Sequence, residues 1–356
     1  HVYDVSFPND VRRISPRLDF PLGREPIAVD SSSQPLRVIS AGSDDKQTTI
    51  AATTGESRIW LVSLTRKRKS LASKEMDTVR TRAKFSLEYP AIQLAMDVDQ
   101  QELYAADARG NLYYFDISNK AEPRLVERVT AVEDGVRITA LAFLSGGISI
   151  LVGDSYGRIT QWFPVRDQEN NYSLRQVRSF HSQTSPITAL APEYFRKGFF
   201  AADAGGALGV YHTTAERVVA LERIAGGAVA RMAVAPRANA LLVERPGGRL
   251  SVLDVENEHP EVSWRALWGK VWYESRQQPE YIWQSSSASS DFEPKFSLTP
   301  LAFGTFKAAL YASLFAVPLA IMGAIYTAYF MHARMRNLVK PTIEIMAALP
   351  SVVIGF

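Results

Sequence analysis

Cysteine is absent from this chain of 356 residues. Its absence excludes a disulfide framework, a thiolate nucleophile and a cysteine-based metal site, but it does not fix the cellular compartment. The sequence also lacks a phosphate-binding loop, a dinucleotide-binding fingerprint and any pair of histidines at zinc-ligand spacing, its histidines being His1, His181, His212, His259 and His332. We therefore predict no metal site, no cofactor and no catalytic residue.

Net charge is nearly absent from most of the chain. Four of the 40 basic residues and one of the 37 acidic residues lie after residue 299, so the first 299 residues are neutral. A neutral surface argues against a broad nucleic-acid footprint, and we expect no nucleic-acid partner. The basic run from Arg66 to Lys69 follows an expected strand. We interpret it as a solvated loop between strands, with contact to acidic lipid headgroups as the alternative.

Charge is absent altogether from the 24 residues between Ala308 and Met331. As an α-helix such a run would extend about 36 Å, which exceeds the ~30 Å hydrocarbon core of a bilayer. We predict a transmembrane helix over residues 300–331. The alternative, a long core helix of a soluble protein, would need a large body of protein on every side.

Two features of this helix predict neighbouring helices. Small residues at every fourth position let another helix backbone approach closely, and these are Ala312, Ala316, Ala320, Ala324 and Ala328. Pro318 interrupts the backbone hydrogen bonds halfway along, and lipid tolerates the freed carbonyl only where other helices or polar side chains cover it. An isolated membrane anchor would need neither feature.

A loose repeat occupies residues 36–255. A turn followed by a strand recurs in the phrases TTGESRIWLV, DARGNLYYFD, DSYGRITQWF, DAGGALGVYH and ERPGGRLSVLD. Four turn glycines, Gly110, Gly157, Gly206 and Gly248, are 47, 49 and 42 residues apart. This spacing is close to the period of about 40 to 50 residues that four-stranded propeller blades have.

The repeat predicts an all-β propeller of the WD40-like type over residues 1–260. β-branched and aromatic residues alternate over short runs between turn residues, and no long helical period is present. A β-sandwich would not be expected to repeat its turn chemistry at this spacing. Five blades are visible, and residues 1–50 and 255–290 could supply one or two more, which gives six or seven blades.

Residues 261–299 are rich in tryptophan. The segment holds Trp264, Trp268, Trp272 and Trp283, and the first three are four residues apart, so on a helix they share one side. Amphipathic aromatic residues ahead of a membrane helix are typical of the membrane interface. A last propeller strand that packs its aromatic residues inward is an equally good interpretation. The polar run QSSSASS at residues 284–290 is a predicted linker.

The residues after the long helix predict its orientation. Segment 332–340 carries three basic residues, and short basic loops lie on the cytoplasmic side. The helix would then run from outside to inside, with residues 1–299 in the periplasm. Residues 341–356 are predicted to begin a second transmembrane helix that runs back.

Four residues of the second helix are candidates for a transport path. Glu344 either pairs with Lys340 at the interface or is an intramembrane carboxylate in such a path. Pro350 and Gly355 flank Ser351 and would loosen the helix where polar backbone can line a cavity. Broken helices of this kind are found in transporters.

One apparent catalytic motif is interpreted as a turn. Gly153, Ser155 and Gly157 spell the pattern G-x-S-x-G. A nucleophile elbow joins a strand to a helix, whereas this motif lies between two expected strands at a repeat turn.

Residues 296–356 resemble a known family. FGTFKAALYASLFAVPLAIMGAIY, the basic loop and KPTIEIMAALPSVVIGF are similar to the start of the core membrane domain of type I ABC importer permeases, most closely the phosphate-specific PstC branch. The resemblance covers about a sixth of the chain. It implies a second permease subunit, a cytoplasmic ATPase dimer and a periplasmic phosphate-binding protein as partners. The best-known members have no large propeller ahead of this core.

These patterns and the resemblance lead to one expected function and one alternative. We expect a non-catalytic permease subunit of an ABC importer for inorganic phosphate in the bacterial inner membrane, with a periplasmic propeller that docks a protein. The alternative is a membrane-anchored propeller that acts as a sensor or envelope assembly scaffold without transport.

Overall fold

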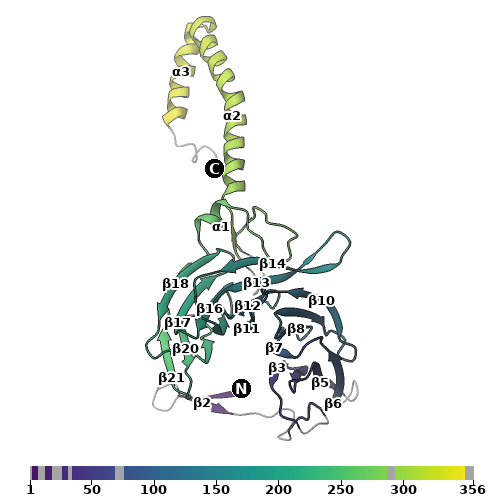
Figure 1. Cartoon of the computed structure of the whole chain (residues 1–356). Coiled ribbons are helices and arrows are strands. Elements are labelled where there is room, and N and C mark those ends of the chain that lie inside the picture. Colours follow the sequence, from purple (N-terminus) through teal and green to yellow (C-terminus); the bar gives the residue numbers. More distant parts are fainter. Residues whose placement is uncertain are drawn as a thin grey trace. The chain divides into compact units, whose positions relative to one another are not determined.

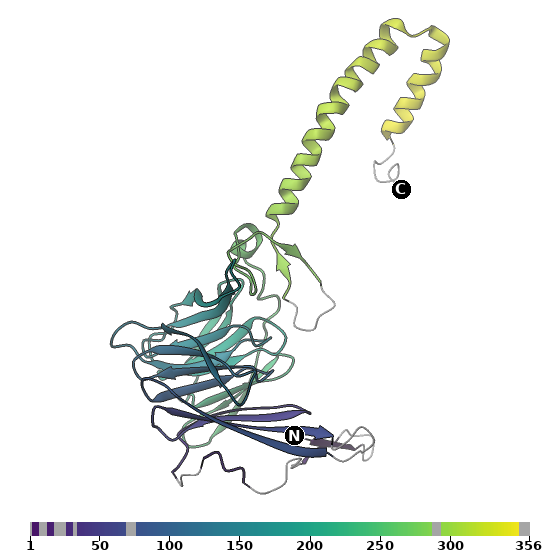
Figure 2. The ribbon, with the colours of Figure 1, turned by 90° about the vertical axis from the view of Figure 1, so that its right-hand side faces the viewer.

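The chain divides into two compact units. The computed structural model describes residues 2–6, 13–17, 26–30, 34–68, 76–286 and 293–348. The β-unit comprises His1–Thr213, Arg217–Glu258 and Glu274–Gln277, and the helical unit comprises Thr214–Glu216, His259–Tyr273 and Gln278–Phe356. Figures 1 and 2 show the ribbon of both units in two views.

The β-unit is built from antiparallel meanders of consecutive strands. The first sheet holds β3 (Val38–Ser43), β4 (Gln47–Thr53), β5 (Arg58–Arg68) and β6 (Met76–Ser86). The second holds β7 (Ala91–Met96), β8 (Glu102–Asp107), β9 (Asn111–Asp116) and β10 (Arg124–Thr130). The third holds β11 (Ile138–Phe143), β12 (Ile150–Asp154), β13 (Ile159–Arg166) and β14 (Tyr172–Phe180).

The remaining sheets of the β-unit follow in chain order. The fourth holds β15 (Ile187–Pro192), β16 (Gly198–Asp203), β17 (Ala207–His212) and β18 (Arg217–Arg223). The fifth has three strands, β19 (Arg231–Val234), β20 (Ala240–Glu244) and β21 (Leu250–Asp254). A separate hairpin pairs β1 (Val2–Ser6) with β2 (Arg13–Arg17).

The repeated phrases of the sequence form the turns between the second and third strands of the five sheets, as predicted. Asp107, Asp154 and Asp203 end their strands and are buried. Each carboxylate accepts a hydrogen bond from the amide four residues later, at 2.8 to 3.0 Å. The buried aspartate therefore closes the turn by satisfying backbone N–H groups that the sheet leaves unpaired.

Glycine suits the backbone conformation of these turns, and at Gly157 it is also required for space. Gly157 has φ +85°, in the left-handed region that disfavours side chains. A Cβ atom there would lie 2.6 Å from the backbone carbon of Gln183. The turn at Gly157 therefore packs directly against the segment that leads into the next sheet. The positive φ that Gly157 shares with Gly110, Gly206 and Gly248 explains why glycine recurs at blade spacing.

The hydrophobic core lies between successive sheets. Leu61 and Phe115 share a cluster between the first two sheets, and Leu151 and Tyr211 share one between the third and fourth. Further clusters join the second sheet to the third and the fourth to the fifth. Burying one such large side chain contributes roughly 1.5–3 kcal/mol, so face-to-face contact between neighbours holds the series together.

The sheets follow one another as blade-like units, but the described residues do not form a closed propeller. The first strands contact in series, β3 with β7, β7 with β11, β11 with β15 and β15 with β19. Figure 1 shows the labelled sheets fanning out in this order. The additional blade expected from residues 255–290 is not formed by the described residues 255–286, which carry a short helix and isolated pairing instead.

The helical unit contains a helix of membrane length. Its elements are α1 (Trp264–Trp268), β22 (Trp283–Gln284), β23 (Lys295–Phe296), α2 (Thr299–Ile325), the π-helix η2 (Tyr326–Phe330) and α3 (Ala333–Ala348). Pro300 lies in the first turn of α2, where its fixed φ suits a helix start. α2 and η2 are continuous over 32 residues, and this is the helix of the described chain long and apolar enough to span a bilayer.

Two predicted loops are secondary structure instead. Segment 332–340, expected as a loop, is helical from Ala333 onward, because it contains mostly good helix formers such as Met, Arg, Leu and Lys. The run from Arg66, expected as a solvated loop, continues strand β5 through Arg68, since β6 supplies a pairing partner that the local sequence did not reveal. Lys69 lies outside the described residues.

Candidate functional site

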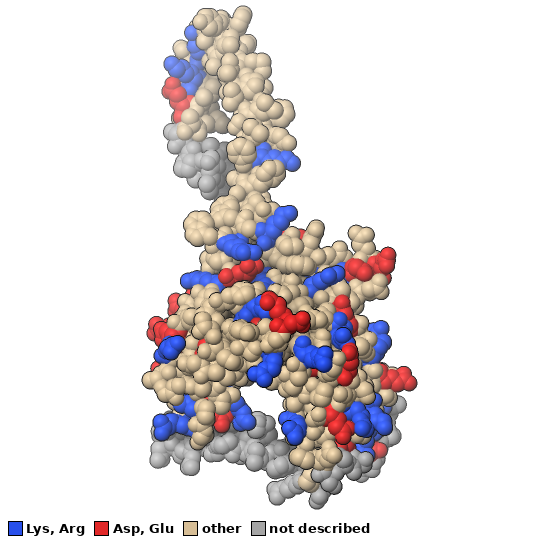
Figure 3. Space-filling model, in the orientation of Figure 1, with Lys and Arg blue, Asp and Glu red and all other residues tan. Residues whose placement is uncertain are grey.

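Helix α2 is the candidate membrane-embedded part of the chain. None of its described residues is buried, and its only charged residue is Lys307 near the start. In Figure 3 the helix is almost entirely free of Lys, Arg, Asp and Glu, whereas both signs of charge are interspersed over the sheets. A helix with one charged residue near its start and an apolar surface on all sides is suited to lipid or to the interior of a helix bundle.

The predicted packing row of alanines is only partly regular. Ala312, Ala316, Ala320 and Ala324 lie on α2, whereas Ala328 lies on η2. The i→i+5 bonding of a π-helix turns the chain less per residue than an α-helix, so Ala328 is rotated away from the row. All five are exposed in the described chain, and their contact with other helices stays a prediction, as does the role of Pro318.

The transport-path candidates lie at the end of the chain. Glu344 is exposed on α3, and in the described part of the chain no ion pair joins it to Lys340. Pro350, Ser351 and Gly355 lie outside the described residues. The second transmembrane helix expected over residues 341–356 is described only as far as Ala348, where it belongs to the helix that began at Ala333.

The tryptophans do not share one helical face. Trp264 and Trp268 lie on α1, which ends at Gly269, so Trp272 falls outside the helix. A Cβ atom at position 269 would lie 2.7 Å from the carbonyl oxygen of Arg265, so the helix end leaves room only for glycine. Ser263 caps the N-terminus of α1 by accepting a hydrogen bond from the Ala266 amide at 3.1 Å. Neither the single helical face nor the inward-facing strand considered from the sequence is therefore observed.

Three of the tryptophans are nevertheless exposed. Trp264 is 82% exposed, Trp268 is 45% exposed and Trp283 is 42% exposed. Trp283 pairs in register with Phe296, and their rings make an edge-to-face contact at 5.9 Å between centroids. This contact flanks the run 284–290 that was predicted as a linker, and β22 pairs with β23 just before α2. The interface role of these side chains stays a prediction.

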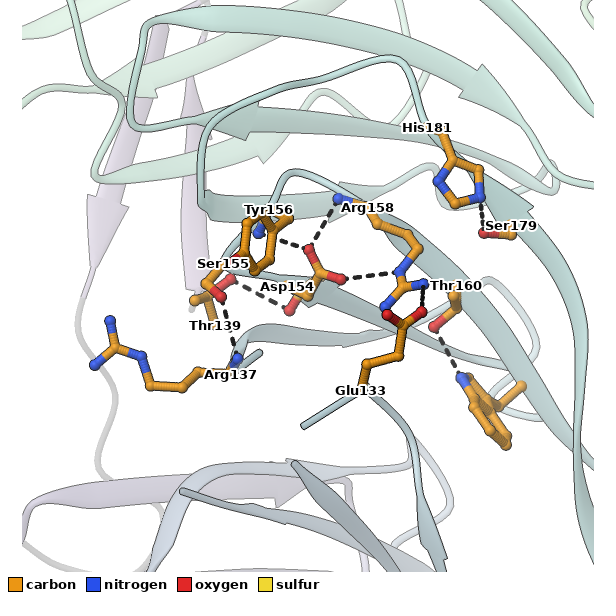
Figure 4. Close-up of polar contacts among 12 residues, drawn as sticks. Glu133, Arg137, Thr139, Asp154, Ser155, Tyr156, Arg158, Thr160, Ser179 and His181 are labelled. Carbon is orange, nitrogen blue, oxygen red and sulfur yellow. Dashed lines mark hydrogen bonds and ion pairs between the residues drawn. The ribbon is translucent and has the colours of Figure 1, made fainter. Parts of the chain in front are cut away.

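The G-x-S-x-G motif forms a turn between β12 and β13 (Figure 4). Ser155 Oγ accepts a hydrogen bond from the Arg137 amide at 3.1 Å. Asp154 holds the turn through the Tyr156 and Arg158 amides. His181 bonds to Ser179 at 2.8 Å rather than to Ser155. The motif is thus arranged as a structural turn, in the place between two strands that the sequence predicted.

A buried ion pair in the β-unit was not found from the sequence. Lys197 Nζ lies 2.5 Å from Glu274 Oε2, and the side chains are 7% and 11% exposed. Glu274 also accepts a hydrogen bond from the buried Ser149 hydroxyl. Glu274 belongs to the short stretch that returns to the β-unit after α1. Because 77 residues separate the pair, no local pattern could have revealed it.

A buried carboxyl group lies on the second sheet. Glu102 Oε1 accepts a hydrogen bond from the Tyr114 hydroxyl at 2.8 Å, while Oε2 is buried without a hydrogen-bond partner. Burial raises the pKa of Glu102 to about 7, the negative charges of Asp97 and Asp116 add to the rise, and the Tyr114 hydrogen bond opposes it. This group therefore changes charge near neutral pH.

Comparison with known proteins connects part of the chain to transport. No family model matches the chain. Over 77 residues it is 32% identical to the "Probable ABC transporter permease protein YqgH" of Bacillus subtilis (strain 168). The match covers 22% of this chain and 25% of the relative, so the chain spans about a quarter of the curated protein it matches. The chain is therefore similar, over part of its length, to an ABC transporter permease.

Proposed function

We propose that this chain is part of a permease subunit of an ABC importer for inorganic phosphate in the bacterial inner membrane. The observation that carries the proposal is an apolar helix of membrane length in a chain that is partly similar to a probable ABC transporter permease. The exposed surface of α2 suits a helix that packs against lipid and other membrane helices. Phosphate specificity rests on the resemblance of residues 296–356 to the PstC branch.

The proposed partners follow from what an ABC importer requires. They are a second permease subunit, a cytoplasmic ATPase dimer and a periplasmic phosphate-binding protein. This chain carries no phosphate-binding loop in its sequence, which is consistent with a non-catalytic subunit whose ATPase is a separate chain. Residues 1–299 would lie in the periplasm.

The β-unit is proposed to be a propeller of six or seven blades that docks a protein. The serial face-to-face packing of its sheets supports this architecture. Propellers present loops and strand edges around a rigid body, which suits recognition of a partner. Closure of the ring would require strands in addition to those of the five sheets.

Phosphate uptake tests the proposal. We expect cells that lack the gene for this chain to lose high-affinity uptake of radiolabelled phosphate at micromolar supply, and expression of the complete wild-type protein to restore it. Unchanged uptake in the deletion strain, with an envelope defect in its place, would favour the membrane-anchored scaffold.

Two further variants separate the interpretations of Glu344. If Glu344 lies in the transport path, Glu344→Gln raises the KM or lowers the maximal rate of uptake while Lys340→Gln does not. If the two residues form an ion pair at the interface, both variants have similar effects on uptake. Because an exposed ion pair contributes little free energy, we expect each effect to stay below about tenfold.

A further inference from the structure

The β5–β6 hairpin is longer than the sheet that carries it. β4 pairs with β5 only as far as Gln47 and Thr65, whereas pairing between β5 and β6 continues through Arg66 with Thr78 and beyond. The hairpin therefore extends past the shorter strands of its sheet, as the dark blue strands of Figure 2 show. β6 is the last strand of this sheet, so one of its edges has no paired strand among the described residues.

A row of basic side chains follows this edge strand. Arg80, Arg82 and Lys84 alternate along β6 and are all exposed, so they share one face at intervals of about 7 Å. Trp60 lies opposite Lys84, and the Lys84 ammonium is 6.0 Å from its ring centroid. Arg66 is opposite Thr78 on the same face. The face therefore combines positive charge with an aromatic ring.

Among the described residues, the three basic side chains of β6 have no carboxylate partner, unlike those on another outer strand. In the described part of the chain no carboxylate is within ion-pair distance of Arg82 or Lys84, and Arg80 donates to the carbonyl of Ala28. On β10, by contrast, Arg124 binds Asp116 and Arg128 binds Glu88. Within the described residues, the basic side chains of the β6 row therefore have no carboxylate within ion-pair distance.

We propose that the edge of β6 binds an extended acidic segment of a partner protein, which adds to the sheet as a further strand. Its backbone pairs with the exposed edge of β6, and carboxylates at every second position lie over Arg80, Arg82 and Lys84. A polypeptide fits because an edge strand offers backbone N–H and C=O groups in addition to charge. A phosphate polymer or a lipid surface would use the charges alone.

This binding mode rests on the docking role proposed for the β-unit and specifies the chemistry of its partner. A purely protective role of the basic row is the alternative. Basic residues on edge strands also prevent unwanted pairing between sheets. In that case an acidic peptide would be attracted by charge alone, without pairing its backbone to β6. The two roles therefore predict different results when backbone pairing is blocked.

The test is a binding measurement on the full chain in detergent micelles. The probe is a fluorescent synthetic peptide that alternates Glu and Thr, followed by anisotropy. We expect saturable binding that weakens with salt and a loss of at least about tenfold in the triple variant Arg80→Ser, Arg82→Ser and Lys84→Ser. The matched triple Arg124→Ser, Arg175→Ser and Arg231→Ser removes the same charge from other sheets and should change affinity less than about twofold.

A second peptide tests the backbone pairing. The same Glu-Thr sequence, N-methylated at alternate residues, keeps every charge but cannot add as a strand, and we expect it to bind at least about tenfold more weakly. The proposal fails if the unmodified peptide does not bind, if both triple variants bind equally, or if N-methylation has no effect. It also fails if polyphosphate or anionic vesicles compete as well as the peptide. Because no transport is measured, these results stand apart from the uptake experiment.

Discussion

The β-unit and the membrane-length helix differ in where their apolar side chains lie. In the β-unit, side chains such as Phe199 and Leu103 are fully buried between neighbouring sheets. On α2, Leu314 and Phe315 are 65% and 70% exposed, and no described residue of the helix is buried. The β-unit therefore draws its stability from contacts within this chain, whereas α2 must draw it from lipid or other helices.

The comparison predicts that the largest effects on the β-unit come from its buried polar contacts. Glu274→Gln leaves the Lys197 ammonium buried without a counter-charge, and we expect the free energy of unfolding of the β-unit to fall by about 3–5 kcal/mol. Chemical denaturation of the chain in detergent, followed by near-ultraviolet circular dichroism, measures this.

A double variant serves as the control for this ion pair. Lys197→Met with Glu274→Leu removes both charges, and we expect it to recover most of the stability that Glu274→Gln loses. Equal losses in the single and double variants would show that the side-chain shapes matter rather than the charges.

The next largest effect concerns the turns that join strands to neighbouring sheets. Gly157→Ala should cost about 2–4 kcal/mol, because the new Cβ meets the Gln183 backbone in addition to the left-handed strain. Gly135 has a similar φ of +81° with nothing within 4 Å of a Cβ. Gly135→Ala should therefore cost only about 1–2 kcal/mol. Equal costs in parallel melts would mean that the turn does not pack as described.

The pH dependence of the β-unit follows from Glu102. Its folded pKa of about 7 lies above its ordinary value of 4.5, so the folded state keeps a proton that the unfolded state loses between these values. This contribution to stability is full below pH 4.5 and is lost as pH rises through 7, by up to about 3 kcal/mol. Glu102→Gln retains the side-chain shape without the charge and should flatten this part of the stability curve measured by denaturant melts from pH 4 to 8. An unchanged curve would rule out Glu102 as its source.

The smallest effect on the β-unit should come from α2. Ala320→Leu enlarges the alanine row and should change the unfolding free energy of the β-unit by less than about 0.5 kcal/mol. The same change should lower recovery of the second permease subunit in co-purification, whereas Met322→Leu, on the opposite side of the helix, should not. A loss of more than about 1 kcal/mol in the β-unit would show that the two regions are energetically coupled.

Local sequence predicted the repeated turns well because a turn depends on few neighbouring residues. Asp107, Asp154 and Asp203 recur at regular spacing in the sequence, each with a glycine three residues later. In the structure these aspartates are buried and the glycines have φ above +80°. The end of α1 at Gly269 and the continuation of β5 through Arg68 were missed. The end of α1 depends on a single glycine. The continuation of β5 depends on pairing with β6, whose residues lie about ten positions further along the chain.

The sequence by itself determined that the chain has repeated strands, glycine turns and an uncharged run long enough to span a membrane as a helix. Each of these features depends only on residues that are close together in the sequence. Only the tertiary structure decided which distant groups meet. It brought Lys197 to Glu274, placed Glu102 beside Tyr114 and aligned Arg80, Arg82 and Lys84 along a strand edge that has no paired strand among the described residues. These contacts depend on the register of paired strands and on the packing of one sheet against the next, which residue spacing does not encode.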